Sequence, residues 1–422
     1  MDQLTSTEIN LVLFSLGGLL ITLGLFSGFL KERFWLSDPL LALLLGILLG
    51  PLVLNWVNLS HWGKPETILE QGARIAIAIQ VMGVALRLPR AYPLKQWRLL
   101  SVLLGLLMPL MWLSSSLLVY WILGTSLWVA LLIGAVITPT DPVISTSVVT
   151  GKIAEQNLPG RIRNAISMES AANDGLAYPF VWLSVLMLTR SPAEAWTEWL
   201  TRTLLWEVGA ASLMGAGIGY LAGRLLLRAE AHQTIEKTSF LSYTLALSLA
   251  ILGLVKLLGG DGILAVFVAG VSFSMVIGGQ ERSQEGEIQE AIDRFFTLYI
   301  FVLLGLALPW QQWLELGWKG LGLAIAVLLL RRLPGVLLLR PLLGRLGRKY
   351  DALFLGWFGP IGVAALFYAM LSLRDTGMES PWIVSSLIIC ISILVHGVTA
   401  VPLAELYHKA ASRTLTIITN NP

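Results

Sequence analysis

The chain has 422 residues, of which 56% are hydrophobic and only 13% are charged. This composition is too apolar for a soluble protein of the same length. The formal net charge of +3 is small, and no basic run is interleaved with aromatic residues as a nucleic-acid surface would require. We therefore expect a membrane protein whose surroundings are the lipid bilayer, and no nucleic-acid partner.

Thirteen apolar segments are long enough to cross a bilayer as helices. They cover residues 9–30, 37–57, 70–88, 99–123, 126–150, 160–188, 203–223, 238–258, 262–279, 290–309, 317–339, 351–373 and 381–405. No basic stretch precedes the first of them, so we expect it to be retained as a span and not removed as a signal peptide. The predicted fold class is an all-α polytopic membrane protein with about 13 transmembrane helices.

The distribution of positive charge predicts how these segments are oriented. With the N-terminus outside, most of the 29 Lys and Arg residues fall in inner loops, as the positive-inside rule requires. We expect a multi-pass protein of the cell membrane, either a plasma membrane or a bacterial inner membrane. Its C-terminus would be cytoplasmic, with residues 406–422 as a short tail.

Two of the thirteen spans carry residues that break a helix. The breaks are marked by Pro139 and Pro142 in the fifth span and by Gly359, Pro360 and Gly362 in the twelfth. Proline removes a backbone donor, and membrane proteins tolerate such breaks where the backbone lines a cavity. Thirteen spans allow an inverted repeat of six plus six around a linking helix, and the two breaks then fall at matching positions. We expect two discontinuous, crossing helices; ordinary proline and glycine kinks are the alternative.

Carboxylates inside apolar spans are costly and mark candidate ion or proton pathways. Asp141 lies between the two prolines of the fifth span, and Asp174 lies in the sixth span with Ser170 on the same helical face. Together with Thr140, these residues offer only oxygen ligands, which suit a hard monovalent cation and not a transition metal. The sequence predicts Na⁺ bound by Asp174, Ser170 and Thr140, with Asp141 beside it.

Cation and proton would compete for the carboxylate of Asp174, and that competition alone can couple their fluxes. A structural hydrogen bond between helices is the alternative for Asp174. Asp141 has the alternative role of neutralising the ends of the half-helices. Asn173 cannot carry a proton, so we expect it to tether the broken helix by hydrogen bonds.

Other polar residues in the spans admit two interpretations each. Glu169 needs a partner, and a buried ion pair with Arg332 would offset both desolvation costs. Arg331 is the alternative partner, and a second proton carrier is the alternative role for Glu169. His396 is either a packing residue or a pH-responsive group, and Gln80 either packs or lines a cavity.

Several motifs resemble the monovalent cation:proton antiporter-1 family of sodium/proton exchangers. They are Thr140 to Val143 (TDPV), Glu169-Ser170 with Asn173-Asp174, Gly262 to Gly270 (GILAVFVAG) and Arg332 to Val336 (RLPGV). The stretches TPTDPV, ESAANDGLAYPF and GWFGPIGVAALFYA are especially similar to the fungal plasma-membrane alkali-cation/proton antiporters and their bacterial relatives. The likeness extends over nearly all of the spans.

This resemblance implies a homodimer in which a core domain moves like an elevator against a dimerisation domain. The dimerisation or scaffold domain would comprise residues 1–98 and 203–309, and the core would comprise residues 99–188 and 317–405. Asp174 then matches the essential cation- and proton-binding aspartate.

The remaining site residues match the family one by one. Asn173 matches the asparagine associated with electroneutral exchange, Ser170 a coordinating serine, and Thr140 with Asp141 the unwound-helix residues. Glu169 and Arg332 match the structural ion pair.

Two departures from the family pattern stand out. The segment from Ile75 to Pro89 lacks the acidic residue that many exchangers carry in the third span. Many relatives also carry an arginine between the glycines corresponding to Gly359 and Gly362, where this chain has Pro360 and Ile361. Both departures put in doubt any transfer of ion preference from animal exchangers.

The sequence therefore predicts a secondary antiporter that exchanges Na⁺ or Li⁺ for H⁺ in an electroneutral cycle without a cofactor, with K⁺ as a further candidate cation. The alternatives are a proton-coupled symporter of a small ion and a cation channel, although no repeated filter sequence favours a channel. No HExxH or GxSxG motif occurs and the histidines are not clustered, so we do not expect an enzyme.

Overall fold

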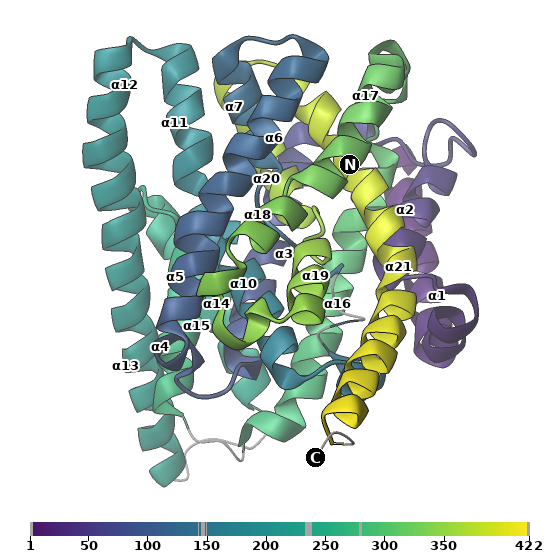
Figure 1. The fold of residues 1–422 in the computed structure, drawn as a ribbon. Coiled ribbons are helices and arrows are strands. Elements are labelled where there is room, and N and C mark those ends of the chain that lie inside the picture. The colour runs from purple at the N-terminus through teal and green to yellow at the C-terminus, as the bar shows by residue number, and fades with distance from the viewer. Residues whose placement is uncertain are drawn as a thin grey trace.

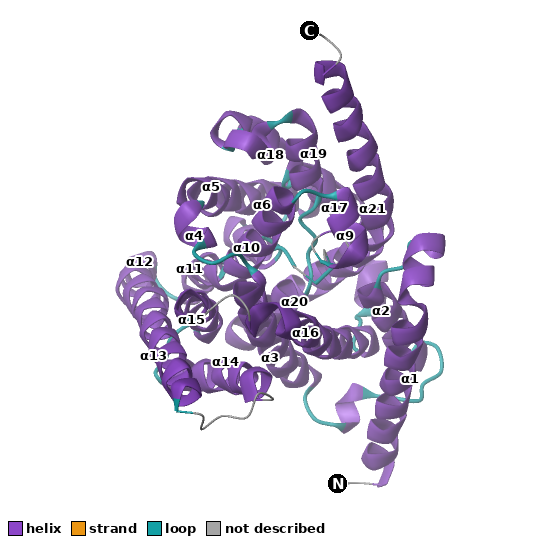
Figure 2. Ribbon diagram, turned by 90° about the horizontal axis from the view of Figure 1, so that it is seen from below, coloured by secondary structure: helices purple, strands orange, loops and turns teal. Residues whose placement is uncertain are grey.

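The computed structural model describes residues 3–141, 143–144, 148, 150–232, 239–277 and 281–419. Helices dominate this part of the chain, and no strand occurs in it (Figures 1 and 2). The predicted all-α fold class is therefore confirmed.

The first half of the chain contains helices that correspond to the first six predicted segments. These are α1 Gln3–Phe34, α2 Asp38–Leu49, α3 Pro65–Arg87, α4 Tyr92–Lys95, α5 Trp97–Val102, α6 Met108–Leu123, α7 Leu127–Val136, α9 Gly151–Asn157, α10 Gly160–Leu176 and α11 Tyr178–Thr189. A π-helical stretch, Leu103–Leu107, joins α5 to α6 without interrupting the rod.

The second half begins with another long rod. A π-helical stretch, Trp199–Ala210, joins α12 to α13. The helices are α12 Pro192–Glu198, α13 Ala211–Ala231, α14 Ser239–Leu257, α15 Gly262–Val276, α16 Glu281–Leu306, α17 Trp310–Leu330, α18 Leu333–Leu338, α19 Lys349–Trp357, α20 Val363–Thr376 and α21 Ser380–Thr419.

Seven of these helices or continuous runs are long and apolar enough to cross a membrane, and four shorter apolar helices accompany them in the described part of the chain. Each of the thirteen predicted segments contains at least one helix. The chain is thus a multi-pass membrane protein, while the count of thirteen crossings stays a prediction.

Several predicted boundaries differ from the observed helices, and three of the differences have a clear physical reason. The seventh segment is helical from Pro192 and not only from 203, because the π-helical stretch continues the rod. The eleventh begins at Trp310 and bends at Gly317, where φ is +54°. The predicted tail, 406–422, is helical as far as Thr419. Hydropathy marks where a span leaves the lipid, but the backbone hydrogen bonds of a helix continue into water.

The two discontinuous helices meet at their breaks. The first is interrupted between α7 and α9 and contains Pro139, while Pro142 lies outside the described residues. The second is interrupted between α19 and α20 at Gly359, Pro360 and Gly362. The backbone N–H of Asp141 donates to the carbonyl oxygen of Pro360 at 2.8 Å, which joins the two breaks directly.

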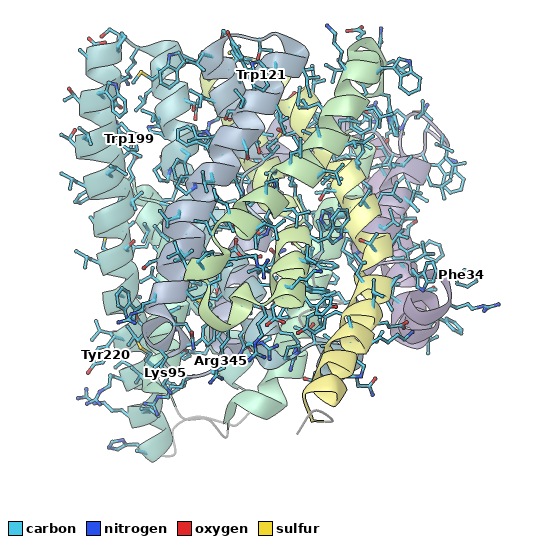
Figure 3. The ribbon with its side chains drawn as sticks, viewed as in Figure 1. Phe34, Lys95, Trp121, Trp199, Tyr220 and Arg345 are labelled. Atoms are coloured by element: carbon cyan, nitrogen blue, oxygen red, sulfur yellow. The ribbon has the colours of Figure 1, made fainter. Side chains whose placement is uncertain are left out.

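Close helix packing surrounds this crossing. Gly215 and Gly219, one turn apart on α13, face α15 so closely that a Cβ atom at either would lie within 2.3 Å of a backbone oxygen. Small residues at this spacing let membrane helices approach each other. In Figure 3, Trp121 and Trp199 lie toward one end of the molecule, and Lys95 and Arg345 lie toward the other.

Candidate ion-binding site

Helix α10 carries four polar side chains into the interior beside the crossing. Glu169, Ser170, Asn173 and Asp174 are each at most 2% exposed. Their spacing places them on two adjacent faces of one helix, as expected. Such burial leaves no access to bulk water in this conformation, so each polar atom depends on protein partners.

A small hydrogen-bond network ties the first helix break to α10. The side chain of Asn173 accepts from the backbone N–H of Thr140 at 3.3 Å and donates to the hydroxyl oxygen of Thr140 at 2.8 Å. The hydroxyl groups of Thr140 and Ser170 are 2.9 Å apart. Asn173 therefore tethers the broken helix, the role expected for a side chain that cannot carry a proton.

Asp141 is surrounded by backbone donors. One carboxylate oxygen accepts from the N–H groups of Val143 at 2.7 Å and Ile144 at 3.2 Å, and the other accepts from Val363 at 2.7 Å. Val363 begins α20, so its N–H lies at the positive end of a helix dipole. The contact requires a glycine at position 362, since a Cβ there would lie 2.1 Å from the carboxylate of Asp141.

Asp174 differs from Asp141 in having an unsatisfied oxygen. It is 1% exposed, and its Oδ1 makes no hydrogen bond. The hydroxyl group of Tyr368 donates to the backbone carbonyl of Asp174, which leaves the carboxylate available. A buried carboxylate without donors is costly when charged, so it favours uptake of a cation or a proton.

Glu169 and Arg332 form a buried two-point ion pair. The guanidinium donates to the two carboxylate oxygens at 2.5 and 2.6 Å, and both side chains are at most 3% exposed. Arg332 also donates through Nε to the carbonyl of Leu355 at 2.9 Å. Of the two arginines that the sequence offered, Arg332 is the one paired with Glu169.

Arg331 has a separate position that the sequence did not predict. Its guanidinium donates to the carbonyl oxygens of Ile137, Thr138 and Gly359. Ile137 and Thr138 follow the end of α7, and Gly359 follows the end of α19, so all three oxygens lie at negative helix ends. Arg331 thus neutralises the C-terminal ends of both broken helices, while Asp141 neutralises N-terminal groups.

His396 is linked to the second break by hydrogen bonds. The hydroxyl of Ser392 accepts from the N–H of Ile361 at 2.8 Å and lies 3.1 Å from Nδ1 of His396, and Nε2 of His396 lies 3.1 Å from the carbonyl of Trp357. Nδ1 of His396 also lies 3.1 Å from the backbone carbonyl of Ser392, so both ring nitrogens have protein partners. This arrangement agrees with the packing interpretation of His396. Sequence reasoning missed Ser392, which carries no motif.

Other predicted features lie away from the crossing. Gln80 of α3 donates to the hydroxyl of Thr297 on α16 at 2.7 Å, which fits a packing role. Glu207 is only 3% exposed and accepts from Tyr178 at 3.0 Å. Asp261 directly precedes α15 and accepts from the N–H groups of Ile263 and Leu264.

The candidate site residues therefore fall into two groups. Thr140, Ser170 and Asn173 are joined directly by hydrogen bonds, and Asp141 is anchored to the backbone beside them. In the described part of the chain, no hydrogen bond joins Asp174 to any of them. A cation held by Asp174, Ser170 and Thr140 together therefore remains a prediction.

Crossed discontinuous helices with buried carboxylates at the crossing define a class of secondary transporters. The sequence profile of a family described as "Sodium/hydrogen exchanger, transmembrane" matches residues 17–406 of this chain. This match covers more than half of the chain. The chain belongs to the sodium/hydrogen exchanger family.

Individual relatives agree with this assignment. The chain is 35% identical to Na⁺/H⁺ antiporter 2 of Zygosaccharomyces rouxii, over 94% of the chain and 53% of the relative. It is 34% identical to a Na⁺/H⁺ antiporter of Saccharomyces cerevisiae, over 94% and 43%. It is 30% identical to a Na⁺/H⁺ antiporter of Schizosaccharomyces pombe, over 94% and 90%. The chain thus spans about half the length of the first two relatives and most of the third.

Solved structures share the fold. Two structures of the sodium proton antiporter MjNhaP1 from Methanocaldococcus jannaschii match with TM-scores of 0.69 and 0.72. The first covers 94% of this chain and 99% of MjNhaP1 at 19% identity, and the second covers both chains fully at 18% identity. At this identity the likeness shows the fold alone.

Proposed function

We propose that the chain is a secondary antiporter that exchanges Na⁺ for H⁺ at Asp174. The observation that carries this proposal is the environment of that carboxylate. Asp174 is buried beside a discontinuous helix, and its Oδ1 has no hydrogen-bond donor. An intramembrane carboxylate in such a place is a functional residue by default. The membership of the family and the names of the three fungal relatives support Na⁺ and H⁺ as substrates.

Competition for one carboxylate provides the coupling. Asp174 carries either a proton or a cation through the membrane, with Ser170 and Thr140 supplying further oxygen ligands for the cation. Asp141 keeps its charge against the backbone donors that surround it. Glu169 keeps its charge against Arg332. The loaded carrier then has the same net charge in both forms, so the exchange is one for one and electroneutral. Li⁺ and K⁺ are further candidate substrates.

Alternating access would come from an elevator motion of the core, residues 99–188 and 317–405, against the scaffold, residues 1–98 and 203–309. One ion pair crosses this proposed boundary. Glu70 of α3 accepts from Arg374 of α20, and Glu70 is 5% exposed. Such a contact between the two domains must break when the core moves. We propose further that two copies associate through their scaffold domains, with the N-terminus outside and the C-terminus in the cytoplasm.

Purified protein in proteoliposomes tests this function. A preset ΔpH is reported by a quenched dye, and Na⁺, Li⁺, K⁺ and Rb⁺ are added in turn. Na⁺ should restore the fluorescence in a saturable manner, and Asp174→Asn should give no response. Ohmic current in planar bilayers would instead indicate a channel. Proton flux that is independent of the cation would indicate a proton-coupled symporter of another small ion. Either result would overturn the proposal.

A further inference from the structure

An apolar groove opens between α19 and α21. Its volume is about 620 Å³. Its walls are mostly leucine and aromatic side chains, which include Tyr350, Phe354, Trp357, Leu403 and Tyr407. A pocket of this size can bury a large part of a small ligand. Both helices overlap predicted spans, residues 351–373 and 381–405, so we expect this groove to face lipid.

One end of the groove adjoins a basic turn. The connection from α18 to α19 consists of two short 3-10 helices, Arg340–Leu342 and Gly344–Gly347, and Arg340 donates to the carbonyl of Gly347 at 3.0 Å. This folded turn presents Arg345, Arg348 and Lys349 as exposed side chains. Lys349 begins α19, and Tyr350 directly after it lines the groove.

The two segments that form this end carry few acidic residues to offset its charge. Within 339–351 and 399–411 the acidic residues are Asp351 and Glu405. Asp351 is buried and accepts from Arg161 at 2.8 Å and from Tyr407 at 2.6 Å, so its charge is already paired. Glu405 does not line the groove. In Figure 3, Arg345 lies toward the same end of the molecule as Lys95. Our orientation places this end at the cytoplasmic leaflet.

We propose that this groove is a binding site for an anionic phospholipid. One acyl chain would lie along the apolar wall between α19 and α21, and the phosphate head group would contact Arg345, Arg348 and Lys349. Basic pockets between membrane helices on the cytoplasmic side bind such head groups. The acyl chain of a zwitterionic lipid would fill the same groove, but its head group would gain little binding free energy from the basic turn. The proposal concerns binding and does not depend on the transported ion.

The groove also borders the second helix break. Trp357 and Phe358 line its deep end, and the carbonyl of Trp357 is held by His396. Phe358 immediately precedes Gly359, whose carbonyl accepts from Arg331. A lipid in this groove therefore packs against the residues that lead into the crossing.

Native mass spectrometry of the full chain in detergent tests the site, with long-chain phosphatidylglycerol as the probe and phosphatidylcholine of the same chains as the comparison. Phosphatidylglycerol should bind the wild type much more tightly than phosphatidylcholine. The triple variant Arg345→Ala, Arg348→Ala, Lys349→Ala should lose most of this preference, because each basic residue contributes about fivefold in affinity and the three together roughly a hundredfold.

Two controls distinguish lipid binding at this site from an effect of total positive charge and from binding of a phosphate group alone. A further variant tests the groove itself. The variant Lys95→Ala, Arg98→Ala, Arg224→Ala removes three exposed basic residues elsewhere in the predicted inner loops, and it should keep the preference. Soluble glycerol phosphate supplies the head group without a chain and should not compete with the lipid. Leu403→Trp, which fills the groove, should weaken phosphatidylglycerol binding while the basic turn stays intact.

Equal binding of the two lipids by the wild type would overturn the proposal. An equal loss in the control triple variant would overturn it too, since the preference would then follow total charge. Competition by glycerol phosphate would show an anion site without a role for the groove.

Discussion

Arg331 donates a hydrogen bond to the carbonyl oxygen of Gly359, inside the break of the second discontinuous helix. The same guanidinium also reaches Ile137 and Thr138 in the break of the first. The resemblance to the exchanger family implies an arginine between the two glycines of the second break in many members, where this chain has Pro360 and Ile361. Arg331 directly follows α17, and its guanidinium places positive charge at the same crossing.

Replacing Arg331 tests whether this side chain supplies the positive charge that an arginine between the two glycines would otherwise provide. Arg331→Met should lower the melting temperature in detergent and reduce exchange, because three buried carbonyl groups lose their donor at a cost of about 1–3 kcal/mol each. The double variant Arg331→Met, Ile361→Arg should recover part of the stability. If Arg331→Met melts like the wild type, the arginine does not hold the crossing together.

The two intramembrane aspartates should respond differently to the same substitution. Asp174→Asn removes the proton carrier but no hydrogen bond at Oδ1, so exchange should be lost while the melting temperature changes little. Asp141→Asn replaces one carboxylate oxygen that accepts backbone N–H groups by an amide donor, so it should lower the melting temperature. Exchange and melting are measured on the same preparations. Robust ΔpH-driven Na⁺ uptake by Asp174→Asn would rule out a single coupling site.

We expect Glu169 to stabilise the fold and not to carry the transported ion or proton. Glu169→Ala leaves Arg332 charged and unpaired in the protein interior, and breaking one side of a buried pair costs roughly 3–5 kcal/mol. We expect a lower yield and melting temperature, with part of the loss recovered in Glu169→Ala, Arg332→Ala. A single variant that melts normally but fails to exchange would make Glu169 a transport residue.

The ion pair between Glu70 and Arg374 offers a test of the proposed domain motion. With Cys390 replaced by alanine, the variant Glu70→Cys, Arg374→Cys should be cross-linked by a short bifunctional methanethiosulfonate reagent, which spans the gap that the Glu and Arg side chains bridge between α3 and α20. The cross-link should stop exchange, and reduction should restore it. A pair within the scaffold, Arg87→Cys, Asp293→Cys, is the matched control and should leave exchange intact when cross-linked. Unchanged exchange in the cross-linked Glu70–Arg374 variant would contradict the motion.

The sequence predicted those parts of the site that follow from helix-breaking residues and from the spacing of side chains along one helix. Proline and glycine marked both breaks, helical spacing placed Asp174 with Ser170, and the amide of Asn173 pointed to a tether for Thr140. The sequence could not assign the separate partners of Arg331 and Arg332, because the backbone break after Leu330 decides which side chain faces Glu169.

Sequence reasoning predicted the distant pair of Glu169 and Arg332 but missed other contacts between distant segments. The hydroxyl of Tyr368 meets the carbonyl of Asp174, and Ser392 meets the N–H of Ile361, although neither pair is close in the chain. Such contacts are set by how helices pack, and no spacing rule encodes them. The extension of α21 to Thr419 was missed for a different reason, since hydropathy reports lipid contact and not helix length.

The central claim is that one carboxylate carries either Na⁺ or H⁺. Its most direct test is whether the exchange rate depends on membrane voltage. Na⁺-driven proton flux is measured in proteoliposomes with K⁺ and valinomycin, where a K⁺ gradient sets the membrane potential, after K⁺ itself has been excluded as a substrate. Moving one net charge would be worth about 2.3 kcal/mol per 100 mV. The account predicts a rate that does not change with imposed voltage. A rate that changes steeply would mean that a second titrating group, with Asp141 as the first candidate, crosses with Asp174, and would contradict the account.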